Sequence, residues 1–153
     1  MISNLSIYNI NKWFYYLYES ECSIMEKSCG AIIFNEDKVL VVKQTSGFYG
    51  FPKGHVEKGE TEKETAIRET KEETGLDIKI ISDKRYTQSY IVKENVHKDV
   101  VFFIAKLENN NEKRQVEEIE EILWIDINEV ENILTYDSLK ELWKEAKKDF
   151  LVL

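Results

Sequence analysis

Three glutamates that lie close together in the sequence carry the clearest chemical signal in this chain. Glu69, Glu72 and Glu73 are spaced so that an α-helix would place them on one face. Like charges at this spacing destabilise an exposed helix by about 0.2–0.5 kcal/mol per pair. A hard divalent cation such as Mg²⁺ removes that penalty, because it prefers carboxylate oxygens and joins them to substrate phosphates. The cluster therefore indicates a metal site, and the alternative is a solvated acidic helix face in a chain that is 33% charged.

The helix that carries these glutamates is expected to begin after Thr61 and to end at Gly75. Thr61 and Glu64 form the Thr-x-x-Glu pattern, in which two side chains satisfy the free amides of a helix N-terminus. Gly75 favours the left-handed conformation that ends many helices. The predicted helix therefore runs for about three to four turns.

The residues around these glutamates resemble the Nudix box, the signature of Nudix hydrolases. The matching positions are Gly54, Glu60, Arg68-Glu69, Glu72-Glu73 and Gly75-Leu76. Thr70 departs from the pattern, because the family usually has an aliphatic residue there and a buried hydroxyl needs a partner. The resemblance implies an α/β/α sandwich with a mixed central sheet, in which the box helix carries the metal site. It also implies hydrolysis of a nucleoside diphosphate linked to another group, with Mg²⁺, or alternatively Mn²⁺, as cofactor.

The resemblance assigns roles to individual box residues. Glu69, Glu72 and Glu73 would hold the metal, together with a main-chain carbonyl at Gly54 or its neighbour Lys53. In the same scheme Arg68 would orient one of the carboxylates, Glu60 would pair with Arg68, and Gly75 would end the helix.

The general base has more than one candidate, because family members draw it either from the box or from the loop before the last strand. That loop contains Glu117, Glu118, Glu120 and Glu121. Glu118 occupies the place that resembles the loop glutamate of the asymmetric diadenosine tetraphosphate hydrolases. We therefore expect catalysis to use Glu118 rather than Glu121, together with Glu73 and Arg68, although most of this acidic loop can simply be solvated.

The segment leading into the box resembles the same subfamily. Phe51-Pro52-Lys53-Gly54-His55 matches it, and the chain has Tyr49 where those relatives often carry tryptophan. Members of this subfamily also tend to carry a substrate-binding tyrosine beyond the box. Tyr90 is near that position in the sequence, and Tyr86 is the second choice. The expected substrate-binding residues are thus Lys53, His55, Tyr49 and Tyr90, and the alternative for Tyr90 is a core position.

The net charge of −8 limits the classes of partner. A protein that grips duplex nucleic acid by its backbone needs a basic face, so that class is disfavoured. A phosphate ester would also be repelled unless metal ions and local cations make the electrostatic potential at the site positive. Lys53, Lys58 and Arg68 lie in or beside the box and could contribute to this. We expect a small nucleotide as partner and leave the oligomeric state open.

The chain of 153 residues is expected to form one Nudix hydrolase domain over residues 25–153, preceded by an extension over residues 1–24. The extension is either an amphipathic helix or the product of an upstream start codon; its apolar residues recur at helical spacing (Ile10, Trp13, Phe14 and Leu17). No apolar run is long enough for a membrane span. Cys22 and Cys29 lack metal or redox spacing, which indicates free thiols in a reducing cytoplasm.

Alternating and helical patterns predict the remaining elements. The expected strands cover residues 29–34, 38–44, 78–92, 99–107 and 122–126, and the expected helices cover residues 128–134 and 138–150. Leu139, Leu142, Trp143 and Ala146 should form the buried side of the last helix.

Three functions are compatible with these observations. The first is a Mg²⁺-dependent hydrolase of dinucleoside polyphosphates, which would convert diadenosine tetraphosphate into ATP and AMP. The second is removal of pyrophosphate from the 5' end of RNA. The third is a nucleotide-binding module without turnover, a class expected to lose one or more box glutamates, and this chain has lost none of them.

Overall fold

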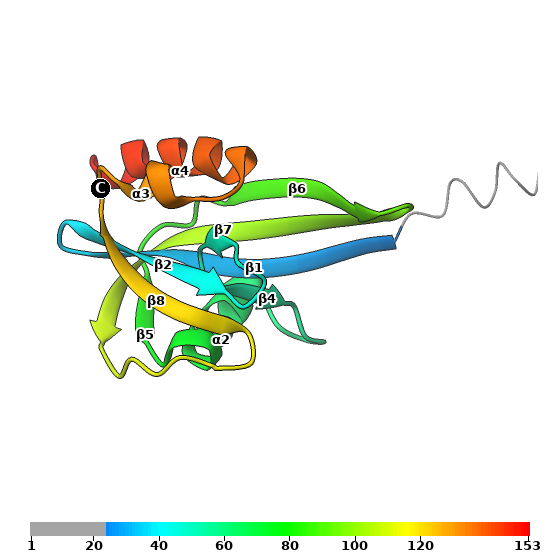
Figure 1. The fold of residues 1–153 in the computed structure, drawn as a ribbon, viewed down its shortest axis with the longest axis horizontal. Helices are drawn as coiled ribbons and strands as arrows, with labels where there is room; N and C mark the ends of the chain where they lie inside the picture. Colours follow the sequence, from blue (N-terminus) through cyan, green and yellow to red (C-terminus); the bar gives the residue numbers. More distant parts are fainter. Residues whose placement is uncertain (1–23) are drawn as a thin grey trace, which may run out of the picture.

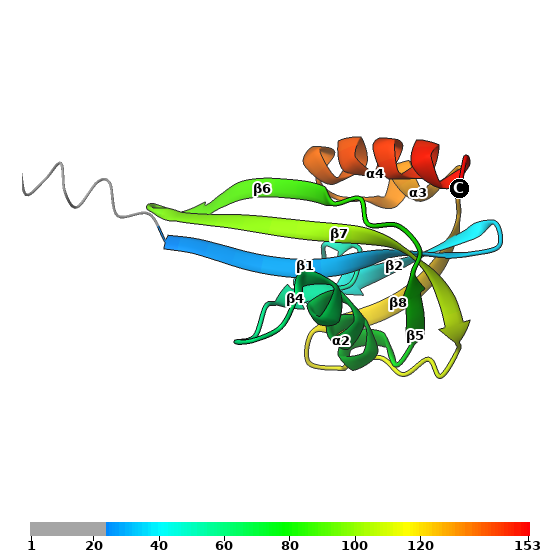
Figure 2. The same cartoon turned by 180° about the vertical axis from the view of Figure 1, so that it is seen from behind.

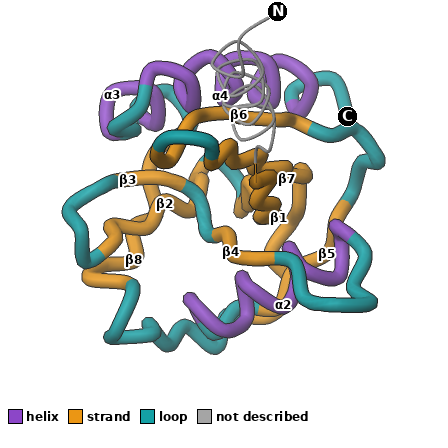
Figure 3. Tube along the Cα trace, turned by 90° about the vertical axis from the view of Figure 1, so that its right-hand side faces the viewer, coloured by secondary structure: helices purple, strands orange, loops and turns teal. Residues whose placement is uncertain are grey.

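The protein is a three-layer α/β/α sandwich in which helices cover both faces of a mixed sheet. The structure, a computed structural model, describes residues 24–153. Helix α2 lies against one face of the sheet, and the short helix α3 and the longer α4 lie against the other (Figures 1 and 2). A view turned by 90° shows α2 and α4 on opposite sides of the strands (Figure 3). The expected fold class is therefore confirmed, whereas the expected N-terminal extension lies outside the described residues except for Ile24.

Eight strands form the sheet around a long parallel pair. They are β1 (Ile24–Asn35), β2 (Lys38–Gln44), β3 (Tyr49–Gly50), β4 (Lys53–His55), β5 (Asp77–Ile80), β6 (Tyr86–Lys93), β7 (Val96–Asn109) and β8 (Ile119–Asp126). The pair β1 and β7 is parallel and the other pairs are antiparallel, which makes the sheet mixed. The predicted hairpin of β1 and β2 is present, and Glu36 takes a positive φ of 55° in its turn.

The prediction of one strand over residues 78–92 was wrong. The structure divides this stretch into β5 and β6, which pair with different parts of β7. Between the two strands, the Lys84 amide donates to the Ser82 hydroxyl at 3.2 Å, a local turn that interrupts the ladder. The alternation of inward-facing and outward-facing residues has the same phase on both sides of the break. Periodicity alone therefore predicts a single strand.

Helix α2 (Glu62–Thr74) has the predicted ends. The Glu64 amide donates to the Thr61 hydroxyl, and the Thr61 amide donates to the Glu64 carboxylate, which completes the capping box. Gly75 ends the helix with a φ of 76°. Thr70 is fully buried and its hydroxyl finds no partner among residues 24–153, so the one departure from the family pattern leaves an orphaned polar group there.

The second helical layer consists of α3 (Val130–Ile133) and α4 (Asp137–Phe150). The side of α4 predicted to be buried is buried, and Trp143 packs against Phe34 and Phe51 in the larger core cluster. Helix α3 is shorter than the predicted helix. Within residues 24–153 no helix has the length and apolar character that a membrane crossing requires.

Candidate active site

Strand β4 lies across the acidic face of α2 and contacts it through three consecutive residues. The Lys53 amide donates to the Glu73 carboxylate at 3.1 Å, and the His55 carbonyl accepts from Arg68 Nη2 at 2.9 Å. Between them, a Cβ on Gly54 would stand 2.0 Å from the carboxyl carbon of Glu69. The glycine of the box is therefore the residue that lets this carboxylate approach the strand.

Arg68 connects the carboxylates of the loop and the helix. Its Nη2 donates to Glu60 Oε2 at 3.0 Å, and its Nη1 donates to Glu69 at 2.8 Å and to Glu72 at 3.2 Å. The hydrogen bond from Arg68 lowers the pKa of Glu60 to about 2. The guanidinium thus fixes the position of two proposed metal ligands while Glu60 fixes the guanidinium.

Glu73 is the most buried carboxylate of the cluster, with 5% of its surface exposed. Burial raises its pKa to about 8, against the opposing hydrogen bond from the Lys53 amide. Burial also raises the pKa of Glu69. In the described part of the chain Glu73 forms no ion pair, so its charge is left without a direct cationic partner.

The chemistry of these donors fits a hard divalent cation, because Glu69, Glu72 and Glu73 offer only oxygens and no cation in the described chain pairs with Glu73. Among residues 24–153 no three side chains of the ligand types are grouped closely enough to hold a metal as they stand. Arg68 engages Glu69 and Glu72, whereas Glu73 faces β4. All three carboxylates are thus held by the protein's own donors, Glu69 and Glu72 by Arg68 and Glu73 by the Lys53 amide.

A polar pocket of about 260 Å³ opens beside these carboxylates. It is lined by Ser28, Gln44, Thr45, Ser46, Lys53, Gly54, His55, Glu73, Lys98, Glu118 and Ile119. Burial and the nearby charge of Lys98 lower the pKa of Lys53. Neither ammonium group forms an ion pair within the described residues, so both are available to an anion. We call this the phosphate pocket.

A second, largely apolar pocket of about 410 Å³ adjoins the first, and Gln44 and Lys53 line both. We call this the aromatic pocket, because its wall includes Phe48, Tyr49, Tyr90 and Tyr136. The rings of Phe48 and Tyr136 lie 5.0 Å apart, and 39% and 46% of these residues is exposed. The Tyr49 amide donates to the Thr135 hydroxyl at 2.9 Å, which ties the two segments together.

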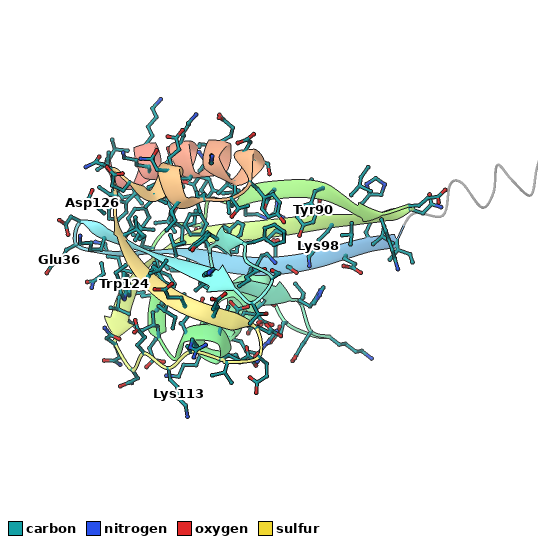
Figure 4. The ribbon with its side chains drawn as sticks, viewed as in Figure 1. Glu36, Tyr90, Lys98, Lys113, Trp124 and Asp126 are labelled. Atoms are coloured by element: carbon teal, nitrogen blue, oxygen red, sulfur yellow. The ribbon has the colours of Figure 1, made fainter. Side chains whose placement is uncertain are left out.

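The structure places the expected substrate-binding residues around these two pockets. Lys53 and His55 line the phosphate pocket, and Tyr49 and Tyr90 line the aromatic pocket. Tyr90 projects from β6 beside Lys98 of β7, its register partner (Figure 4). Tyr86, the second choice, is a core residue whose hydroxyl donates to Asp149 at 2.6 Å.

The acidic loop delivers one glutamate to the phosphate pocket. Glu118 lines the pocket, and the Thr45 amide donates to its carbonyl at 2.9 Å. Glu121 lies opposite Lys43 on the exposed part of β8, and Glu120 pairs with that lysine. Of the loop glutamates in the described chain, only Glu118 lines this pocket.

Several pocket residues were missed by sequence reasoning, namely Ser28, Phe48, Lys98 and Tyr136. Lys98 could have been found, because strand alternation puts it on the same face as Val100 and Phe102. Phe48 and Tyr136 gave no usable signal, since their contact depends on how β3 meets the start of α4.

Comparisons with known proteins identify relatives of this chain. A family model described as "NUDIX domain" matches residues 26–150. The chain is 29% identical over 136 residues to "Bis(5'-nucleosyl)-tetraphosphatase [asymmetrical]" of Mus musculus, covering 78% of this chain and 92% of the relative. It is 35% identical over 117 residues to "m7GpppN-mRNA hydrolase" of Saccharomyces cerevisiae, covering 72% of this chain but 12% of the relative. The solved structure of a C. elegans Ap4A hydrolase binary complex matches with a TM-score of 0.76 and 26% identity, covering 84% of this chain and 99% of that one.

Proposed function

Because the chain belongs to the Nudix family of hydrolases that act on phosphorus-containing anhydrides, we propose that its substrates are dinucleoside polyphosphates. The preferred reaction converts diadenosine tetraphosphate into ATP and AMP. The observation that carries this proposal is the junction of an aromatic pocket with a phosphate pocket through Gln44 and Lys53. A nucleobase needs the first kind of pocket and a polyphosphate needs the second. The names of the murine and nematode relatives support the same substrate class.

The proposed roles follow from the positions of the side chains. Lys53, Lys98 and His55 bind phosphate oxygens, and Tyr49 and Tyr90 help to enclose a base. Divalent metal ions, which Nudix hydrolases generally use, neutralise phosphate charge and lower the pKa of bound water. Glu69, Glu72, Glu73 and a main-chain carbonyl at Gly54 are the proposed ligands for Mg²⁺ or Mn²⁺. Arg68 positions Glu69 and Glu72, and Glu118 accepts a proton from the attacking water.

The extent of the domain and its compartment are part of the same proposal. The Nudix hydrolase domain comprises residues 25–153 and residues 1–24 are an extension. Cys29 is a buried free thiol, and nucleotide hydrolysis by such a chain is proposed to take place in the cytoplasm.

Product analysis tests the proposed reaction directly. We expect diadenosine tetraphosphate and Mg²⁺ to give ATP and AMP on ion-exchange chromatography, and EDTA to abolish both products. Running the reaction in ¹⁸O-labelled water should place the label in one product only, because water attacks a single phosphorus. Symmetric cleavage to two molecules of ADP would contradict the proposal.

A second candidate substrate is the 5' end of RNA, which the similarity to the yeast m7GpppN-mRNA hydrolase favours. The net charge of −8 weighs against a long anionic polymer. A triphosphorylated RNA is therefore incubated in parallel. Release of pyrophosphate from RNA without cleavage of the dinucleotide would move the substrate to nucleic acid.

Tyr136→Ala is expected to raise KM for diadenosine tetraphosphate by roughly ten- to hundredfold, the range given by loss of one base–aromatic stack. The ring of Tyr136 lies beside that of Phe48 in the wall of the aromatic pocket and is half exposed, so the change should leave the core intact. Steady-state kinetics measures the effect, with Tyr136→Phe as the matched control that keeps the ring. An unchanged KM in the alanine variant would remove Tyr136 from the base site.

A further inference from the structure

The hydroxyl group of Ser28 is a buried donor that has no partner in the described part of the chain. Ser28 is 0% exposed, and within residues 24–153 its Oγ and that of Thr70 are the two buried side-chain oxygens that make no hydrogen bond. Native proteins satisfy the great majority of such groups, because an unpaired buried hydroxyl is destabilising. An orphaned hydroxyl at a pocket wall therefore indicates a partner that arrives with a ligand.

The strand pairing of β1 aims this hydroxyl at the phosphate pocket. Ser28 lies opposite His55 of β4 and Val100 of β7, and the adjacent residue Cys29 faces α2 instead. Ser28 lines the phosphate pocket, whereas Thr70 does not. Because β1 is paired on both sides at this point, the backbone holds the hydroxyl in a fixed position.

The charges around Ser28 identify the class of ligand. Lys53 and Lys98 line the same pocket, neither of them neutralised by an ion pair in the described chain. A hydroxyl that lines the same pocket as two ammonium groups is a suitable donor to an anionic oxygen, and O–H to O⁻ hydrogen bonds are short and strong. The carboxylates of Glu73 and Glu118 could also accept, but neither does so in the structure.

We propose that Ser28 donates a hydrogen bond to a non-bridging phosphate oxygen of the bound polyphosphate, alongside Lys53 and Lys98. This inference rests on the proposed function. Ser28 is then a substrate-binding residue that fixes the orientation of one phosphate, because a short side chain on a paired strand has few rotamers to lose. The charges of the two lysines attract the phosphate over a longer distance, and the directional hydrogen bond from the hydroxyl fixes how the phosphate is oriented.

Ser28→Ala is expected to lower kcat/KM for diadenosine tetraphosphate by roughly ten- to hundredfold, the range for a hydrogen bond to a charged group. Its melting temperature should equal or exceed that of the wild type, because the orphaned hydroxyl is removed. Thr70→Val is the matched control: it deletes the other orphaned hydroxyl with little change of volume and should leave kcat/KM unchanged. Wild-type kinetics in Ser28→Ala, or a loss of activity that follows a fall in melting temperature, would overturn the proposal.

Binding of inorganic tripolyphosphate in EDTA gives an independent test that does not need turnover. The wild type and Thr70→Val should show the same rise in melting temperature with tripolyphosphate, and Ser28→Ala a smaller one. If the wild type cleaves no dinucleotide, the proposed function fails, yet this difference still supports the role of Ser28. Equal shifts in all three proteins, or no shift in the wild type, would contradict it.

Discussion

Glu73→Gln is expected to reduce kcat by about a thousandfold, since several kcal/mol of charge stabilisation depend on the metal that this carboxylate is proposed to hold. The substitution keeps the size of the side chain and leaves an oxygen to accept from the Lys53 amide. It removes the negative charge, which is what a hard cation requires. Steady-state turnover of diadenosine tetraphosphate with Mg²⁺ measures the change.

Stability separates this effect from misfolding. Burial raises the pKa of Glu73 to about 8, which means that a charged carboxylate at this position destabilises the folded protein. The neutral amide carries no such cost, and in EDTA the variant should melt at the same temperature as the wild type or higher. Glu141→Gln on the exposed side of α4 removes the same charge as a control and should keep full activity. Unchanged turnover in Glu73→Gln would contradict the metal assignment.

An acidic protein can bind a polyphosphate only if the electrostatic potential at the binding site is more positive than that of the protein as a whole. The phosphate pocket brings Lys53 of β4 and Lys98 of β7 together, although the chain as a whole carries a charge of −8. Arg68 meanwhile pairs with Glu60 before the helix and with Glu69 and Glu72 on α2, one cation among three carboxylates. Acidic groups therefore outnumber cations at the site, and Glu73 has no cationic partner among the described residues, which favours a divalent cation there.

Local sequence patterns predicted those parts of the site whose residues are close together in the sequence. Thr61, Glu64 and Gly75 defined both ends of α2 because caps depend on residues within one turn. The common face of Glu69, Glu72 and Glu73 follows from the helical period, and the buried side of α4 from the same rule. The contact of Arg68 with Glu60 was expected only from the family resemblance.

Contacts between distant strands could not be predicted in this way. Ser28 and Lys98 line the same pocket because β1 and β7 pair in parallel in one particular register. The sequence of either strand, taken by itself, does not specify that register. The break between β5 and β6 was missed for a related reason, since both segments satisfy the same alternation while pairing with different parts of β7. Side chains whose role depends on such pairing are the ones that the sequence leaves unassigned.

Glu118→Gln is expected to lower kcat by roughly a hundred- to ten-thousandfold, the contribution typical of a general base. Glu118 lines the phosphate pocket together with Glu73, and its loop is anchored by the hydrogen bond from the Thr45 amide. Its charge adds to the effect of burial in raising the pKa of both Glu69 and Glu73, which shows that it lies near these two carboxylates. Steady-state kinetics with diadenosine tetraphosphate measures the loss.

The behaviour of KM distinguishes a base from a binding residue in the Glu118→Gln variant. Removing a carboxylate from a pocket that receives phosphates reduces repulsion, so KM should stay the same or fall while kcat drops. Glu121→Gln changes the same residue type three positions along, outside the pocket, and should retain wild-type kcat and KM. A Glu118→Gln enzyme that keeps its kcat would move the proton transfer to a box glutamate, and Glu73 would then have to serve both as ligand and as base.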